Sequence, residues 1–220
     1  MIIVIEGGDQ AGKLTQSTLL EKALKKRKIK TKVFHFPDYK TPIGKEIRKY
    51  LDGKRKFPPQ VIHCLLAANR WEKLNEILVA QEKNSVLIMN RYYHSNLVYG
   101  IANGMKQKWL DNLDAGLPKG DLVILLDVTQ KESFRRQKTH RDKFEKNEEF
   151  LRKISKIYKI TAKKKHWEII DASKVAEAYS KVMIADFVIS ISRKVEDKIA
   201  NTSRFHVIKN RFGIDGITFP

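Results

Sequence analysis

The chain has 220 residues, 42% of them hydrophobic, which is enough for one folded domain or for one domain with a small appendage. Lys and Arg number 44 against 25 Asp and Glu, so the net charge of +19 predicts anionic partners such as nucleotides, nucleic acid or acidic surfaces, unless it only solvates the surface. The single cysteine excludes an internal disulfide, and there is no signal peptide or apolar run of ~20 residues, so we expect a cytoplasmic protein without a membrane segment.

The first predicted element is a short buried strand over residues 1–6, followed by the loop Gly-Gly-Asp-Gln-Ala-Gly-Lys (7–13) and by an amphipathic helix from Gln16. Strand, glycine loop and helix in this order form the phosphate cradle of P-loop proteins. Backbone N–H groups and the helix N-terminus converge on phosphate oxygens, and Lys13 reaches the β- and γ-phosphates. Leu14 stands where the motif needs a Ser or Thr hydroxyl for Mg²⁺. The sequence therefore predicts a nucleotide phosphate site with an altered metal site.

Apolar strands and helices alternate along the rest of the chain. Strands are predicted at 33–36, 85–89, 121–127 and 166–170, and helices at 43–51, 61–81, 148–165 and 174–191. This alternation predicts a doubly wound α/β fold, in which a parallel β-sheet has helices on both faces and ligands bind at the C-terminal strand ends. Cys64 lies in an apolar stretch and is predicted to be part of the core.

The last 26 residues break this rhythm. Residues 204–208 and 216–219 flank the basic, glycine-containing segment 209–213, which predicts a short β-hairpin. We therefore expect a main domain over residues 1–194 and a basic extension over 195–220, either purely structural or in contact with DNA.

Several separate segments narrow the function beyond nucleotide binding. They are Phe-Pro-Asp (36–38), Ala-Asn-Arg-Trp-Glu (68–72), Asn-Arg-Tyr (90–92) with Ser95 and Tyr99, Gly-Leu-Pro-Lys-Gly-Asp-Leu-Val (116–123), Asp-Lys-Phe-Glu (142–145) and Asp-Ala-Ser-Lys (171–174). In this order and spacing they resemble the thymidylate kinases among the P-loop nucleoside monophosphate kinases, with the eukaryotic branch most similar, over about residues 1–190. The resemblance implies phosphoryl transfer from ATP to the 5′-phosphate of dTMP, which gives dTDP for dTTP synthesis.

The resemblance also implies the site residues. ATP would contact Gly7, Gly8, Asp9, Gln10, Ala11, Gly12, Lys13, Leu14, Thr15, Ser173 and Lys174. The acceptor would contact Asp9, Phe36, Asp38, Tyr39, Leu66, Arg70, Asn90, Arg91, Tyr99 and Phe144. The catalytic residues would be Lys13, Arg91, Asp9, Arg136, Arg141 and Lys143, the last three on a closing lid around 134–147.

Individual roles follow from the same resemblance. Arg70 would clamp the acceptor phosphate, because a guanidinium binds two phosphate oxygens at once. Arg91 would bridge to the same phosphate and to the charge that develops on the transferred group. Tyr99 would flank the nucleoside. A phosphate acceptor is already a nucleophile near neutral pH, so the reaction needs positioning and cations more than a strong base.

The sequence departs from the family pattern at five site positions. Leu14 lacks the metal-binding hydroxyl, and Asn90 stands in place of an aspartate near the metal. Either Mg²⁺ would be held mainly by the nucleotide phosphates and water, or metal use would be weakened, and no metal ligand is assigned. Leu66 replaces an aromatic that stacks on the base, and Phe144 replaces a tyrosine. Tyr39 replaces an arginine that binds the acceptor phosphate, for which Lys40 could substitute. The preferred base of the acceptor therefore stays open.

Two functions from different classes fit these residues. The first is an active kinase that uses ATP and a pyrimidine deoxynucleoside monophosphate, and it is favoured because Lys13, Asp9, Arg70 and Arg91 all survive. The second is a weak or inactive kinase-derived protein that binds nucleotide or nucleic acid. The family resemblance further implies a homodimer through the long helices, for which residues 61–78 offer an apolar face.

Overall fold

The computed structural model describes residues 1–83, 85–136, 148–173, 187–192, 204–210 and 218–219. The chain divides into two compact units, Met1–Ala172 and Ser173–Pro220. The domain boundary expected at residue 194 lies inside the second unit and stays a prediction.

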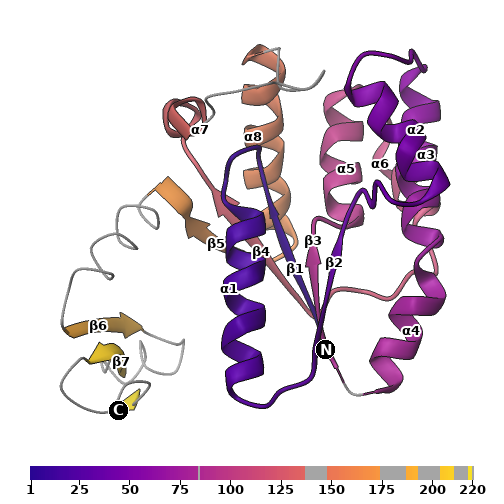
Figure 1. The fold of residues 1–220 in the computed structure, drawn as a ribbon. Helices are drawn as coiled ribbons and strands as arrows, with labels where there is room; N and C mark the ends of the chain where they lie inside the picture. The colour runs from indigo at the N-terminus through magenta and orange to yellow at the C-terminus, as the bar shows by residue number, and fades with distance from the viewer. Residues whose placement is uncertain (84, 137–147, 174–186, 193–203, 211–217, 220) are drawn as a thin grey trace. The chain divides into compact units, whose positions relative to one another are not determined.

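A parallel β-sheet forms the centre of the first unit (Figure 1). Its strands in the described residues are β1 (Ile2–Gly7), β2 (Thr31–His35), β3 (Val86–Asn90), β4 (Leu122–Asp127) and β5 (Glu168–Asp171). They lie in the order β2-β3-β1-β4-β5, and every neighbouring pair is parallel. The order reverses after β1, so the glycine loop leaves the sheet at a topological switch point, where ligands bind in open α/β sheets.

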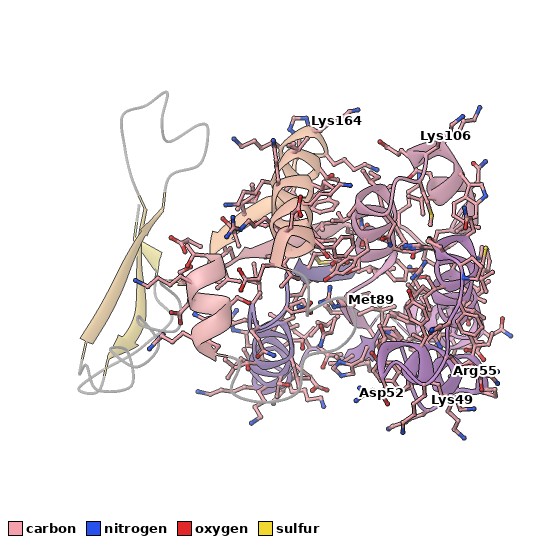
Figure 2. All side chains as sticks on the ribbon, turned by 90° about the horizontal axis from the view of Figure 1, so that it is seen from above. Lys49, Asp52, Arg55, Met89, Lys106 and Lys164 are labelled. Carbon is pink, nitrogen blue, oxygen red and sulfur yellow. The ribbon has the colours of Figure 1, made fainter. Side chains whose placement is uncertain are left out.

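Helices cover both faces of this sheet. The described helices of the first unit are α1 (Lys13–Lys26), α2 (Pro42–Leu51), α3 (Pro59–Trp71), α4 (Leu74–Glu82), α5 (Tyr93–Ala102), α6 (Gln107–Leu113), α7 (Gln130–Arg136) and α8 (Glu148–Lys164). Alternate residues of a strand face opposite ways. Accordingly, Val4 and Met89 belong to the core with α4, α5 and α8, whereas Ile5 and Ile88 belong to the core with α1. Met89, which is fully buried, lies near the middle of the unit in the view of Figure 2. The predicted doubly wound α/β fold is confirmed.

Two local expectations in the first unit are wrong. The single helix predicted over 61–81 is two helices, because α3 ends at Trp71 and α4 begins at Leu74. At the break the Lys73 N–H donates to the Arg70 carbonyl, three residues back, and the Trp71 indole donates to the Leu113 carbonyl. Cys64 is exposed, since it lies on the outer side of α3. None of the helices in the described part of the chain combines the length and apolar character needed to cross a membrane.

In the second unit, the described residues form an antiparallel sheet in the order β6-β7-β8. The pairing of β7 (Arg204–Asn210) with β8 (Thr218–Phe219) agrees with the predicted hairpin. Strand β6 (Phe187–Ser192) falls where a helix was predicted, and that part of the prediction is wrong. Its sequence, Phe-Val-Ile-Ser-Ile-Ser, is rich in β-branched residues, which favour a strand. The rest of the predicted helix, 174–186, lies outside the described residues.

Candidate active site

The glycine loop between β1 and α1 has a backbone that only glycine adopts freely. Gly7 has a φ of 150°, and a Cβ there would lie 2.6 Å from the Leu126 carbonyl oxygen. Gly12 is left-handed, with a φ of 86°, and caps α1. The Lys13 side chain is 9% exposed, and its Nζ donates to the Gly8 carbonyl oxygen at 2.6 Å. The ammonium group is therefore held within the loop that is predicted to bind phosphate.

The start of α1 offers little to a metal ion. Leu14 is 61% exposed, and the Ser17 and Thr18 hydroxyls both donate to the Leu14 carbonyl oxygen. At the end of β3, Asn90 Nδ2 lies 3.1 Å from His35 Nδ1. In the part of the chain that the structure describes, no group of three His, Cys, Asp or Glu residues could hold a metal. These residues do not fit a protein-built metal site.

Arg91 lies at the centre of the polar network beside the loop. It follows β3 with a φ of 62°, and its backbone N–H donates to the Ile5 carbonyl oxygen at 3.0 Å. Its guanidinium donates to Asp9 Oδ1 at 2.6 Å and to the Gly7 carbonyl oxygen at 3.2 Å. Burial opposes its charge, but the surrounding acidic groups, Tyr99 and Asp9 foremost, raise the pKa of Arg91 well above the usual value. Arg91 therefore remains a cation and fixes the loop to the sheet.

Glu6 is linked to Arg91 through Ser95, whose hydroxyl accepts from Arg91 and donates to Glu6. The sequence did not indicate this role for Glu6. Its fully buried carboxylate accepts hydrogen bonds from Tyr92 N at 2.9 Å, Ser95 Oγ at 2.5 Å and Tyr158 OH at 2.9 Å. Burial raises the pKa of Tyr158 well above the usual value, and Glu6 adds to this, so the phenol stays protonated and can donate. The only signal in the sequence was a carboxylate that ends a buried strand just before the loop.

A cavity of about 300 Å³, here called the Arg91 cavity, opens next to this network. Its lining includes most of the predicted acceptor contacts: Asp9, Phe36, Tyr39, Leu66, Arg70, Arg91 and Tyr99. Tyr99 donates to Asp9 Oδ2 at 3.2 Å, and Arg91 lies over its ring at 5.7 Å. The structure thus gathers side chains from the glycine loop, from the segments that follow β2 and β3, and from α3 and α5 around one volume. Two predicted contacts lie elsewhere: Asp38 lines a different cavity, and Asn90 pairs with His35.

Arg70 enters the Arg91 cavity as part of an ion pair. Its Nε and Nη2 donate to the two carboxylate oxygens of Asp114 at 2.7 and 2.8 Å, and both side chains are almost fully buried. Nothing in the sequence pointed to Asp114. This fork-to-fork pairing fixes the guanidinium and compensates its charge.

Asn96 is a further lining residue that the sequence did not single out. Its Oδ1 lies 2.6 Å from Nδ1 of the buried His63, and its Nδ2 donates to the His63 carbonyl oxygen at 3.2 Å. An amide oxygen only accepts, so His63 Nδ1 carries the proton and Nε2 accepts from Asn103 at 3.1 Å. Burial lowers the pKa of His63, in keeping with this neutral form. Asn96 is therefore held rigidly beside the cavity.

Helix α7 reaches back to the glycine loop. Ser133 Oγ donates to the Asp9 carbonyl oxygen at 2.8 Å, and Arg136 donates to the carbonyl oxygens of Gln10 at 3.3 Å and Ala172 at 2.8 Å. Arg136 thus ties the loop to the chain after β5. The predicted Arg141, Lys143, Phe144 and Lys174 lie outside the described residues.

Comparisons with known proteins agree on one family. The family model described as thymidylate kinase matches residues 5–183. Thymidylate kinase of Dictyostelium discoideum is 32% identical over 181 residues, covering 82% of this chain and 81% of that protein. That of Plasmodium falciparum is 37% identical over 176 residues, covering 80% and 83%, respectively. A solved thymidylate kinase structure from Candida albicans superimposes with a TM-score of 0.69 at 24% identity, covering 100% of this chain and 97% of that one, and supports the fold alone.

Proposed function

This chain belongs to the thymidylate kinase family, and we propose that it transfers the γ-phosphoryl group of ATP to the 5′-phosphate of dTMP. An oxygen of the acceptor phosphate bonds to the γ-phosphorus, and the bond from that phosphorus to the β,γ-bridging oxygen breaks. The products are dTDP and ADP. The observation that carries the proposal is the Asp9–Arg91 pair, which joins the glycine loop to the cavity expected to hold the acceptor.

The glycine loop supports the donor half of the reaction. Lys13 already lies among the loop carbonyls, and its ammonium group would exchange the Gly8 carbonyl for the β- and γ-phosphates. The backbone N–H groups at the start of α1 add a positive dipole. Arg91, kept charged and in place by Asp9 and Glu6, would stabilise the transferred group from the acceptor side.

Magnesium is proposed to enter as part of the substrate, as MgATP. The exposed Leu14 and the Asn90–His35 pair offer it no carboxylate or hydroxyl. The ion would therefore depend on phosphate oxygens and water, which Mg²⁺ keeps readily.

Arg70 suits the base end of the acceptor better than the phosphate end that the sequence suggested. Its partner Asp114 would repel a dianionic phosphate, and the buried pair carries no net charge. The donors left on the guanidinium match a neutral carbonyl oxygen, such as those of thymine. Leu66 would cover the ring, and Asn96 would supply amide hydrogen bonds.

The remaining site residues keep their proposed roles. Arg136 would support the donor site through its bonds to Gln10 and Ala172, while Ser173 and Lys174 would lie along the adenine. Arg141 and Lys143 would act from the lid. A cytoplasmic location is likewise proposed.

We infer a homodimer from the outer side of the α3–α4 region. Val61, Leu78 and Val79 are each more than two-fifths exposed there, and Cys64 is exposed too. Exposed apolar side chains along neighbouring helices are available to an association surface. Light scattering after gel filtration should give twice the mass of 25.6 kDa, and Leu78→Glu should shift the protein to monomer.

A coupled assay of ADP release tests the function. Purified protein is mixed with ATP and Mg²⁺ and with dTMP, dUMP, dCMP, dGMP or no acceptor. We expect the greatest stimulation with dTMP. Stimulation mainly by another monophosphate would change the acceptor and keep the reaction class. Folded protein that binds ATP and shows no stimulated release would favour the alternative, a kinase-derived binding protein.

A further inference from the structure

Among the described residues, three arginines line the Arg91 cavity: Arg48, Arg70 and Arg91. Arg70 and Arg91 are 3% and 17% exposed, and each forms a short ion pair, with Asp114 and Asp9, respectively. Their charge is therefore largely compensated before any ligand arrives. A phosphate monoester carries up to two negative charges, and the cavity needs a cation that is not already neutralised.

Arg48 is that cation. It lies in the last turn of α2, its side chain is 58% exposed, and its Nε lies 3.0 Å from Asp52 Oδ1. Among the described residues, Asp52 is the one ion-pair partner of Arg48. Asp52, which caps the C-terminus of α2, lies at the edge of the unit in the view of Figure 2. An exposed i,i+4 pair of this kind contributes at most about 1 kcal/mol, so Arg48 is free to bind a stronger partner.

Tyr39 holds Arg48 over the cavity. The guanidinium carbon lies 5.3 Å from the centroid of the Tyr39 ring, within the range of a cation–π contact. Tyr39 lines the same cavity, so its ring forms a platform on which the planar guanidinium rests. The platform limits the rotamers of Arg48 while its outward N–H groups stay available.

Lys40, the nearest alternative cation in sequence, is placed differently. It lines an adjoining cavity together with Asp38 and Lys73 but does not line the Arg91 cavity, although the two cavities share Tyr39. Its backbone N–H donates to Asp38 Oδ1 at 3.0 Å.

We propose that Arg48, supported by the Tyr39 ring, binds the 5′-phosphate of the acceptor nucleotide in the Arg91 cavity. Its fork of N–H groups matches two phosphate oxygens, and Arg91, which follows β3 and is paired with Asp9, would add hydrogen bonds to the same phosphate more than net charge. The proposal rests on the proposed function in taking this cavity as the acceptor site. It assigns to α2 a specificity for nucleoside monophosphates over nucleosides.

The test compares Arg48→Ala and Arg48→Lys with Arg55→Ala. Arg55 is a matched control, because it is 56% exposed, pairs through Nε with Glu46 at 3.3 Å and does not line the cavity. Calorimetry measures binding of dTMP and of thymidine, which lacks the phosphate. Steady-state kinetics give KM for dTMP and ATP, and thermal unfolding checks the fold.

Arg48→Ala should weaken dTMP binding and raise KM for dTMP by about 10- to 100-fold, the range for a hydrogen bond between charged groups. Thymidine binding and KM for ATP should not change. Arg48→Lys should fall in between, since it keeps the charge and loses the fork. Arg55→Ala should match the wild type.

The proposal is wrong if Arg48→Ala binds dTMP as tightly as the wild type does. It is also wrong if the substitution weakens the binding of dTMP and of thymidine equally, or if the folded wild-type protein does not bind dTMP. The proposed function fails separately. If the wild-type protein binds dTMP through Arg48 but releases no ADP, the phosphate contact of Arg48 is supported and the proposed kinase activity is wrong.

Discussion

The Arg91 cavity is the proposed acceptor site and the glycine loop the proposed donor site of one reaction. The two regions are built in different ways. At the cavity, two arginines are largely buried and already paired, Arg70 with Asp114 and Arg91 with Asp9. In the loop, Lys13 holds a backbone carbonyl, and Leu14 extends into solvent. A buried charge destabilises the fold unless an opposite charge is paired with it. A phosphate-binding loop depends mainly on glycines that allow its backbone conformation. Damage to the cavity should therefore reduce folding and activity together, and damage to the loop should reduce activity alone.

Removing Asp114 should have the largest effect. Asp114→Ala leaves the Arg70 charge buried without a partner, which should lower the free energy of unfolding by about 3–5 kcal/mol. Chemical denaturation followed by circular dichroism measures this loss. Glu21→Ala breaks the exposed pair with Lys25 and should cost less than about 1 kcal/mol. Equal, small losses in both variants would mean that the cavity does not depend on buried pairing.

Lys13→Ala should come next, and it should act on the rate. Loss of the ammonium at the transferred phosphoryl group should lower kcat by about 10²- to 10³-fold. Stability should fall by less than in Asp114→Ala, because the Gly8 carbonyl is neutral and its loss of Lys13 leaves no charge buried without a partner. Lys22→Ala, an exposed position on the same helix, serves as the control. A loss of stability as large as that of Asp114→Ala would contradict the contrast between the two regions.

Leu14→Thr should improve the loop. A hydroxyl at this exposed position would give Mg²⁺ a ligand, and the Mg²⁺ concentration for half-maximal rate should fall by roughly tenfold. Titration of the metal at saturating ATP measures the shift. Leu14→Ala shortens the side chain without adding a hydroxyl and should leave the requirement unchanged. If both variants lower the Mg²⁺ requirement equally, the effect comes from the smaller side chain and not from a hydroxyl that binds Mg²⁺.

The smallest effect concerns the partly buried pair of Asp38 with Lys73, whose side chains are 21% and 23% exposed. Burial raises the pKa of Asp38, but the hydrogen bonds from Lys73 and from the Lys40 backbone outweigh it, so the net pKa is lowered. A lowered pKa stabilises the fold above the unfolded value, near 4, and this contribution is lost as the pH falls through the folded value. Lys73→Met should therefore be less stable by about 0.5–1 kcal/mol at pH 7.

The pH dependence supplies the check on this pair. Denaturation of the wild type and Lys73→Met between pH 7 and pH 3 should show the difference shrinking on the acid side. Glu76, which also contacts Lys73 and has a lowered pKa, should contribute in the same direction. A difference that stays constant with pH would assign the effect of Lys73 to packing.

Prediction from the sequence was most successful where a local pattern carries the information. The buried strand, the glycine loop and the helix after it lie where residues 1–26 indicated, because each follows from local composition. Prediction failed at the break after Trp71 and at β6, where side-chain contacts or β-branched residues outweigh helical spacing. For the site, most predicted acceptor contacts gather in one cavity, while Asp38 and Asn90 do not.

The sequence by itself determined the fold class, the phosphate loop and the family, because these depend on residue order and spacing within short segments. Only the tertiary structure decided which charges are free. Asp114 neutralises Arg70, which is 44 residues away in the sequence. Glu6 accepts a hydrogen bond from Tyr158, which is 152 residues away. Arg48 meets Tyr39 over the cavity only because α2 folds back beside its rim. The net charge available to a ligand depends on distances in space, which the order of residues does not contain.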